Sequence, residues 1–285
     1  MFKEIAVDPV AVATSFRDLS YVVEKFGIPE GRLIARFPKH WRRLAYLAAE
    51  ARHKGTVELS RIQERLRRIE DSALISRSRP GEGCDADWLG AAIAEHGRLP
   101  FDGIIASAQR PEPFVVKLDE LDGGHPLLAS ARQKHVARRA AAMADVCGPI
   151  LTHARHIKLV DPHFEANAPR FRNPFHAFLA KVPDDTLVDV FQGDRDDAPV
   201  AVGQIDRALR ALDMRGCKVR LFLRPQAAMH NRFVLSNLGG VSFGTGLDED
   251  FGGERVDDLV AILEKGPWQT EWNRYTGDDP VGEWR

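Results

Sequence analysis

The sequence predicts an α/β protein whose N-terminal region is mostly helical. Strand and helix patterns alternate from residue 156 onwards, which is typical of a mixed, largely parallel sheet flanked by helices. Helical patterns occupy most of the first 80 residues. Late in the chain, a Gly-Gly turn between two apolar runs predicts a β-hairpin. We therefore divide the 285-residue chain into a mostly helical region, 1–120, and an α/β region, 121–285.

Apolar residues at helical spacing and turn-forming residues define the elements of the first region. Asp85 is a candidate N-cap for its fourth helix. A long Ala- and Arg-rich segment then predicts a helix that leads into the second region. The predicted helices cover 15–26, 38–52, 57–76, 87–96 and 125–151, and short strands are expected at 101–107 and 114–118.

The second region alternates between apolar runs rich in β-branched residues and amphipathic helical patterns. The expected order is β-α-β-α-β-β-β-α, in which the fourth and fifth strands form the hairpin. Strands are predicted at 156–160, 186–191 and 218–223, and helices at 173–182, 202–214 and 256–263.

The hairpin carries the most informative residues of the chain. His230 and Arg232 are two residues apart, so on a strand both side chains would point to the same face. An imidazole that can act as a nucleophile and a permanent cation then project together, which suits a phosphoryl group. The alternative is a buried hairpin whose histidine is a hydrogen-bonded core residue.

The spacing of this segment resembles the motif of the phospholipase D superfamily. In that motif His-x-Lys is followed by Asp after four residues, and by Gly-Ser after six more. Here His230 matches the histidine, and Arg232 stands where Lys is usual. Asn237 takes the place of Asp, and Gly244-Thr245 takes the place of Gly-Ser. The register is kept at every position, so we expect a phospholipase D-like half-domain.

The resemblance also implies a homodimer. The superfamily's active site normally combines two such motifs, and this chain contains one. His153-Ala154-Arg155 has the first spacing but precedes a strand and lacks the downstream Gly-Ser. A two-fold axis would bring the two copies of His230 face to face.

The resemblance implies that the protein is a phosphodiesterase that needs no metal ion or cofactor. His230 would form a phospho-histidine intermediate and Arg232 would stabilise phosphate charge, while Asn237, Gly244 and Thr245 would contact the substrate. Single-motif members include nucleases of bacterial genome defence. The main alternative is a catalytically degenerate nucleic-acid-binding or scaffold subunit of a larger defence complex. A lipid-cleaving enzyme is a third option, but no amphipathic segment supports a membrane surface.

Asp161 is a further candidate for substrate binding. It directly follows the strand predicted at 156–160, and ligands in open α/β sheets bind beyond the carboxyl ends of the strands. The alternative is an Asp-Pro turn that only ends the strand.

The net charge of −1 conceals a basic N-terminal region. Residues 1–80 contain 16 Lys and Arg against 10 Asp and Glu, a balance of +6. Arg36, Arg42 and Arg43 lie in its most basic segment and are candidates for binding DNA or RNA. A solvated helix face, neutralised by nearby glutamates, is the competing interpretation.

Composition indicates a cytoplasmic protein that binds no membrane. The sequence has no run of 18 apolar residues, and its first residues lack the apolar core of a signal peptide. Cys84, Cys147 and Cys217 fit neither a disulfide framework nor a zinc site.

Overall fold

The computed structural model describes residues 1–285 except 71–72, 76–78, 251–255 and 278. The chain forms two compact units, Phe2–Ala131 and Arg132–Arg285, the second of which also includes Met1. The boundary lies later than the expected one near residue 120, because Leu121, Leu127 and Leu128 pack into the core of the first unit.

The N-terminal unit is built on a five-stranded sheet, of which only the strands expected at 101–107 and 114–118 were predicted. All four pairings in this sheet are parallel, and the strand order is β3-β2-β1-β4-β5. The strands are short and buried on both faces, so they appear in the sequence as brief apolar runs without alternation. They are β1 (Lys3–Val7), β2 (Arg32–Ala35), β3 (Leu74–Ile75), β4 (Gly103–Ala106) and β5 (Val115–Lys117).

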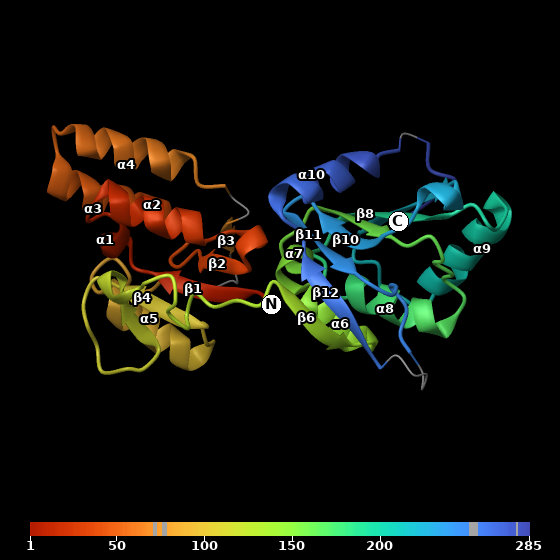
Figure 1. Cartoon of the computed structure of the whole chain (residues 1–285), viewed down its shortest axis with the longest axis horizontal. Helices are drawn as coiled ribbons and strands as arrows, with labels where there is room; N and C mark the ends of the chain where they lie inside the picture. Colours follow the sequence, from red (N-terminus) through yellow and green to blue (C-terminus); the bar gives the residue numbers. More distant parts are fainter. Residues whose placement is uncertain (71–72, 76–78, 251–255, 278) are drawn as a thin grey trace. The chain divides into compact units, whose positions relative to one another are not determined.

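Helices cover both faces of this sheet (Figure 1). Ile5, Val7 and Ile34 share one hydrophobic cluster with the first four helices. On the other face, Ala6 and Ile104 pack with the fifth helix. That helix is capped by Asp87 and not by Asp85, because the Asp87 carboxylate accepts the N–H of Gly90. The helices are α1 (Pro9–Val12), α2 (Phe16–Lys25), α3 (Trp41–His53), α4 (Val57–Arg67) and α5 (Trp88–Arg98).

The C-terminal unit contains an eight-stranded mixed sheet with the order β13-β9-β8-β7-β10-β11-β12-β6. Three central strands, β7 to β9, are parallel, and the remaining pairings are antiparallel. The predicted hairpin is present and turns between Ser236 and Gly239. The strands are β6 (Gln133–Ala137), β7 (His156–Val160), β8 (Leu187–Gly193), β9 (Lys218–Arg224), β10 (Arg232–Ser236), β11 (Gly239–Phe243), β12 (Asp257–Ile262) and β13 (Gly282–Trp284).

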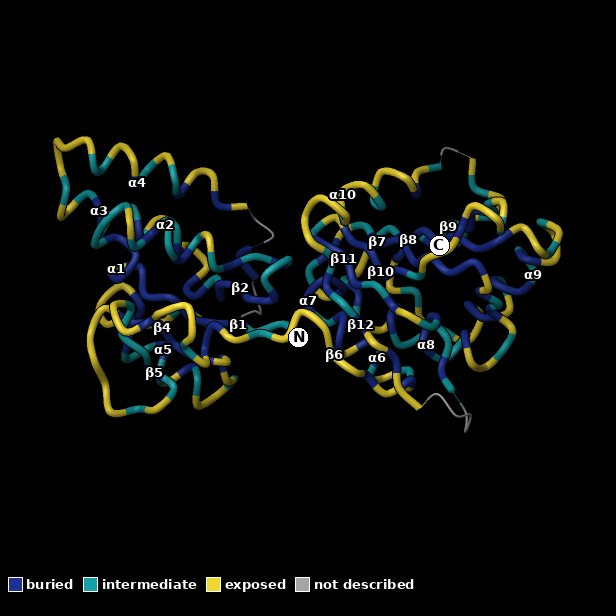
Figure 2. The backbone as a smooth tube through the Cα atoms, viewed as in Figure 1, coloured by how far each residue is buried: buried dark blue, intermediate teal, exposed yellow. Residues whose placement is uncertain are grey.

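Figure 1 shows α10 on one side of this sheet and α6 and α8 on the other. Beneath α10, Phe191, Phe222 and Phe233 form a cluster with Tyr275, against which Trp268 packs. The buried strands form the dark centre of the unit in Figure 2. The helices are α6 (Ala140–Val146), α7 (Gly148–Thr152), α8 (Pro169–Leu179), α9 (Ala198–Leu209) and α10 (Lys265–Arg274).

Two predicted helices of this region are wrong. The segment expected as one helix at 125–151 contains β6 and then α6 and α7. The segment expected as a helix at 256–263 is β12, in which buried residues alternate with more exposed ones, as on a strand with unequal faces. Among the described helices, none has the length and apolar character needed to cross a membrane.

Candidate functional site

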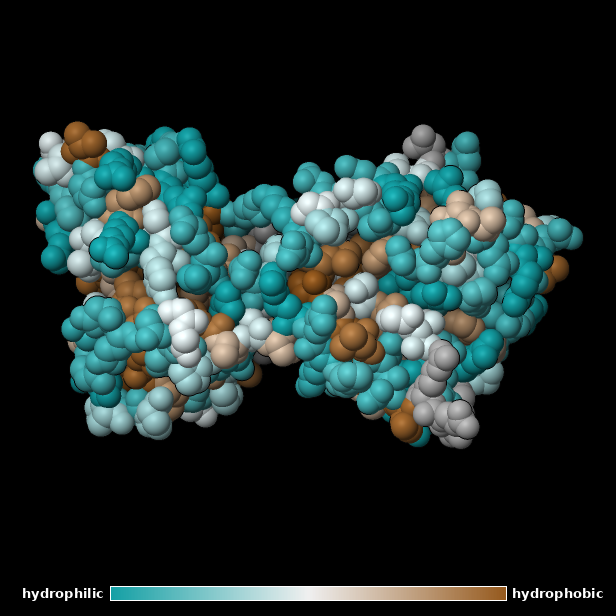
Figure 3. All heavy atoms as spheres, in the orientation of Figure 1, coloured by the Kyte–Doolittle hydropathy of each residue, from teal (hydrophilic) through white to brown (hydrophobic). Residues whose placement is uncertain are grey.

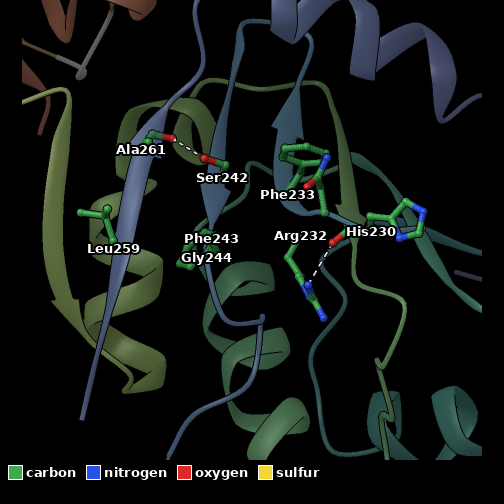
Figure 4. A pocket seen from close by; sticks show the side chains of 9 residues that line it. His230, Arg232, Phe233, Ser242, Phe243, Gly244, Leu259 and Ala261 are labelled. Carbon is green, nitrogen blue, oxygen red and sulfur yellow. Dashed lines mark hydrogen bonds between the residues drawn. The ribbon is translucent and has the colours of Figure 1, made fainter. Parts of the chain in front are cut away.

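A cavity of about 260 Å³ lies where β10 begins and β11 ends. His230, Arg232 and Gly244 line it together with apolar side chains of the sheet, including Phe233 and Leu259 (Figure 4). Three residues of the motif therefore border one cavity, although they lie up to 14 positions apart in the sequence.

His230 and Arg232 do not project together as expected. Strand β10 begins at Arg232, so His230 precedes it and the two-residue repeat of a strand does not set its direction. Figure 4 shows the imidazole and the guanidinium pointing in different directions. Arg232 Nη1 instead donates a hydrogen bond of 3.0 Å to the carbonyl oxygen of His230. The imidazole belongs to an exposed residue, so His230 is not a core histidine.

Arg232 retains unused hydrogen-bonding capacity. Its Nε atom is buried and has no hydrogen-bond partner within the described parts of the chain. A buried donor left unpaired costs free energy, so an acceptor that reaches this guanidinium would be favoured. Burial raises the pKa of Asp161, and the positive charge of Arg232 partly opposes that rise.

Asp161 lies directly after β7 and beneath the loop that follows β11. Its side chain is almost fully buried, and it accepts N–H hydrogen bonds of 2.8 Å from both Leu247 and His163. Burial raises the pKa of the Asp161 carboxyl above its usual range, and these two N–H donors oppose the rise. Asp161 thus fixes the loop from below instead of lining the cavity.

Gly244 and Thr245 are held by an acid that the sequence reasoning missed. Asp258, on β12, accepts hydrogen bonds of 3.0 Å from the Thr245 backbone N–H and from the Thr245 hydroxyl. A Cβ atom at Gly244 would lie 2.9 Å from Asp258 Oδ1, so the close approach favours glycine. The Thr245 hydroxyl, expected to contact the substrate, is therefore engaged within the protein.

Two further acids fix the loop after β11. Arg138 forms an ion pair of 2.6 Å with Asp248. The Glu249 carboxylate accepts hydrogen bonds from the backbone N–H of Ala140 and from the side-chain amide of Asn173. Together with Asp161 and Asp258, these contacts anchor the loop on the Gly244 side of the cavity to the rest of the unit.

Asn237 does not lie at the cavity. It occupies the hairpin turn, about seven residues beyond His230, which is roughly 20 Å along a strand. Its side-chain oxygen accepts the backbone N–H groups of Arg155 and His156. The expected contact between Asn237 and a substrate is replaced by a structural role at the opposite end of β10.

The three basic candidates of the N-terminal unit differ from one another. Arg36 follows β2 and is partly buried, whereas Arg43 is exposed on α3. Arg42 Nη2 donates a hydrogen bond of 2.6 Å to the carbonyl oxygen of Ile69, so this side chain links α3 to the chain beyond α4. Only Arg43 is a cation with its side chain largely in solvent.

The sequence matches no protein-family model, and it matches no curated protein. Among solved structures the chain is similar to TrmBL2, described as an archaeal chromatin protein with a novel mode of DNA binding. The likeness covers 50% of this chain and 53% of that chain, at 11% sequence identity and a TM-score of 0.27. The match thus spans about half the length of that protein.

Proposed function

We propose that the protein is a metal-independent phosphodiesterase, specifically a nuclease that acts as a homodimer. The observation that carries this proposal is the cavity in which the exposed imidazole of His230 and the guanidinium of Arg232 lie beside Gly244. An accessible imidazole can attack phosphorus, and a guanidinium can stabilise the charge on the non-bridging oxygens. The motif resemblance supports the same chemistry.

In the proposed reaction, a nitrogen of His230 attacks the phosphorus of a phosphodiester. The bond between phosphorus and the leaving oxygen breaks, and His230 of the partner subunit donates a proton to that oxygen. Water, deprotonated by the same partner residue, then attacks the phospho-histidine and releases the phosphomonoester. Arg232 exchanges its hydrogen bond to the His230 carbonyl for the phosphate oxygens, which also gives its buried Nε an acceptor.

The decisive experiment compares wild type with His230→Ala on labelled DNA and RNA in the presence of EDTA. We expect cleavage by wild type and none by the variant, whose folding should be unchanged because residue 230 is exposed. His135→Ala is a matched control, since His135 is an exposed histidine of the same unit that does not line the cavity. Loss of wild-type cleavage in EDTA, or cleavage by His230→Ala at the wild-type rate, would overturn the proposal.

The homodimer can be tested through the same residue. If each site needs His230 from two subunits, a mixed dimer of wild type and His230→Ala has no complete pair. Adding excess His230→Ala to wild type, with time for subunits to exchange, should therefore reduce activity well below the value expected from simple mixing. Light scattering should give the mass of two chains. An unchanged rate in the mixture, together with a monomeric mass, would contradict a shared site.

We further propose that the N-terminal unit contributes to nucleic-acid binding through exposed cations. Arg43 and Lys39 are both exposed, whereas Arg42 is committed to the Ile69 carbonyl and is a poor choice for testing. Replacing Arg43 and Lys39 with Glu should weaken DNA or RNA binding and reduce its dependence on salt concentration. Filter binding at several salt concentrations measures both quantities. Unchanged affinity would favour a protein-docking role for this surface.

A specific observation favours a second candidate function, a nucleic-acid-binding subunit that does not cleave. The Thr245 hydroxyl is bound to Asp258, and the Arg232 and His230 side chains point in different directions. Under this alternative, wild type retains and shifts labelled nucleic acid without cutting it, with or without EDTA. The cleavage assay described above therefore distinguishes the two functions.

A further inference from the structure

The N-terminal unit contains a second cavity, which the proposed nuclease does not use. Its volume is about 340 Å³, a size typical of small-molecule sites. It lies at the carboxyl edge of the parallel sheet, beside the residues that end β4 and those that follow β1 and β5. From β1 the chain adds β2 and β3 on one side, and it then returns to add β4 and β5 on the other side. The strand order therefore reverses between β1 and β4. Open α/β sheets bind ligands at such a reversal.

The cavity combines an apolar wall with hydrogen-bonding and charged groups. Val10 is half exposed, although it is a large apolar residue. Figure 3 shows hydrophobic side chains at the surface between α1 and β4, with hydrophilic ones around them. The polar lining consists of two hydroxyls, two carboxylates and two cations, from Thr14, Ser107, Asp18, Asp119, Lys117 and Arg52.

Each charged group of the lining keeps capacity for a ligand. Arg52 is exposed at the end of α3 and forms no ion pair with a residue that the structure describes. One oxygen of Asp18 accepts a hydrogen bond from the Ser15 hydroxyl, and one oxygen of Asp119 pairs with Lys117 at 2.6 Å. Because a carboxylate has two oxygens with several lone-pair positions, both acids can accept further hydroxyl groups.

The arrangement disfavours a simple anion. The carboxylate of Asp8 already accepts the N–H of Val10 at the start of α1, where an anion would otherwise be drawn. Asp18 and Asp119 also offset the charges of Arg52 and Lys117. A matching ligand needs hydroxyl groups for the acids, an apolar face for Val10 and a negative group for Arg52.

We propose that this cavity binds a ribonucleoside monophosphate. The ribose hydroxyls donate to the carboxylates of Asp18 and Asp119, a pairing that nucleotide sites on parallel sheets use for the ribose. The phosphate pairs with Arg52 and Lys117, and the base lies against Val10. This binding is independent of the proposed cleavage, because every residue involved belongs to the N-terminal unit.

The test is calorimetric titration of the full chain with the four ribonucleoside 5′-monophosphates, their deoxy counterparts, the free nucleosides and inorganic phosphate. We expect at least one ribonucleotide to bind more tightly than its deoxy form, its nucleoside or phosphate alone. Arg52→Gln should weaken that affinity roughly tenfold or more, since it removes a charged hydrogen-bond donor. Asp18→Asn should bring the ribose and deoxyribose affinities closer together.

Two controls locate the binding. Arg67→Gln makes the same charge change at an exposed arginine on α4 that does not line the cavity, and it should leave affinity unchanged. Arg232→Gln, in the other unit, should also bind normally. Thermal unfolding of each variant checks that it is folded. The proposal is overturned if no monophosphate binds at millimolar concentration, if phosphate alone binds equally well, or if Arg232→Gln abolishes binding while Arg52→Gln retains it.

Discussion

The two units contain the same Val-Asp-Pro turn at the end of a central strand, and they use it differently. Asp8 follows β1, and Asp161 follows β7. Both carboxylates are buried, and in both, Oδ1 accepts the backbone N–H two residues later at 2.8 Å. In both, Oδ2 accepts an N–H from a distant loop that returns to the same edge of the sheet.

The difference lies in what the distant loop supplies. For Asp8 it supplies Ser107, whose N–H and hydroxyl both donate to Oδ2, so the turn borders a cavity lined by hydroxyls. For Asp161 it supplies the buried N–H of Leu247, and Arg232 lies near enough to influence the carboxyl. A short local motif therefore fixes the turn, while residues 71 to 99 positions away determine the chemistry beside it.

The largest expected effect is on the cleavage rate, which should depend on one cavity and not on the other. Arg232→Ala should reduce phosphodiester cleavage by about a hundredfold, because about 3 kcal/mol of stabilisation of transition-state charge is lost. Arg52→Ala, in the other cavity, should leave the cleavage rate of a small chromogenic phosphodiester unchanged. Steady-state kinetics on that substrate measure both. Equal losses in the two variants would show that the cavities do not have separate roles.

The next effect concerns the stability of the N-terminal turn. Asp8→Asn keeps one acceptor oxygen but replaces the other with an amide that cannot accept from Ser107. We expect the free energy of unfolding of this unit to fall by about 2 kcal/mol, the usual range for lost hydrogen bonds to a charged group. Hydrogen exchange of peptides within residues 2–131 measures the loss. Unchanged protection of β1 and β4 would show that the Asp8 contacts contribute little.

At neutral pH, Asp161→Asn should lower the free energy of unfolding by about 1 kcal/mol, which is less than the loss expected for Asp8→Asn. The loss is smaller because the substitution also removes a buried charge. The pKa of Asp161 is raised in the folded protein, so the folded state holds this proton to a higher pH than the unfolded state does. Stability contributed by Asp161 therefore declines as pH rises above about 4, through the interval up to its folded pKa. Urea denaturation across pH should show wild type losing stability relative to Asp161→Asn in that interval. The opposite slope would mean that the Asp161 pKa is lowered.

The sequence predicted the parts of the fold that have local signatures. The bounds of β7 and the hairpin of β10 and β11 agree with the expectation, because apolar runs and a Gly-Gly turn mark them. In the N-terminal sheet, β4 and β5 lie within the short strands expected at 101–107 and 114–118, whereas β1, β2 and β3 were missed because they have two to five residues and no alternation. A helix was assigned to the segment of β12, and this error also hid Asp258, the inward-facing acid that binds Thr245.

The sequence predicted which residues line the candidate site, but it did not predict their side-chain directions or their hydrogen-bond partners. The spacing identified His230, Arg232 and Gly244, which line one cavity. Side-chain directions depend on where β10 begins: the strand starts at Arg232, so its alternation of faces does not extend back to His230. The partners of Thr245 and Asn237 are set by tertiary contacts with β12 and the start of β7, and no local pattern encodes them.

The smallest effect tests whether the Ser107 hydroxyl, which donates to Asp8, stabilises the fold or contributes to ligand binding. Ser107→Ala removes the 2.5 Å hydroxyl hydrogen bond to Asp8 but keeps the backbone N–H bond to the same oxygen. Because Asp8 retains its two N–H donors, the free energy of unfolding should fall by less than about 1 kcal/mol. If the neighbouring cavity binds a nucleotide, the same substitution should reduce the free energy of monophosphate binding by more than it reduces the free energy of unfolding. Calorimetric titration and hydrogen exchange on the one variant compare the two losses. A stability loss that exceeds the binding loss would assign Ser107 a structural role only.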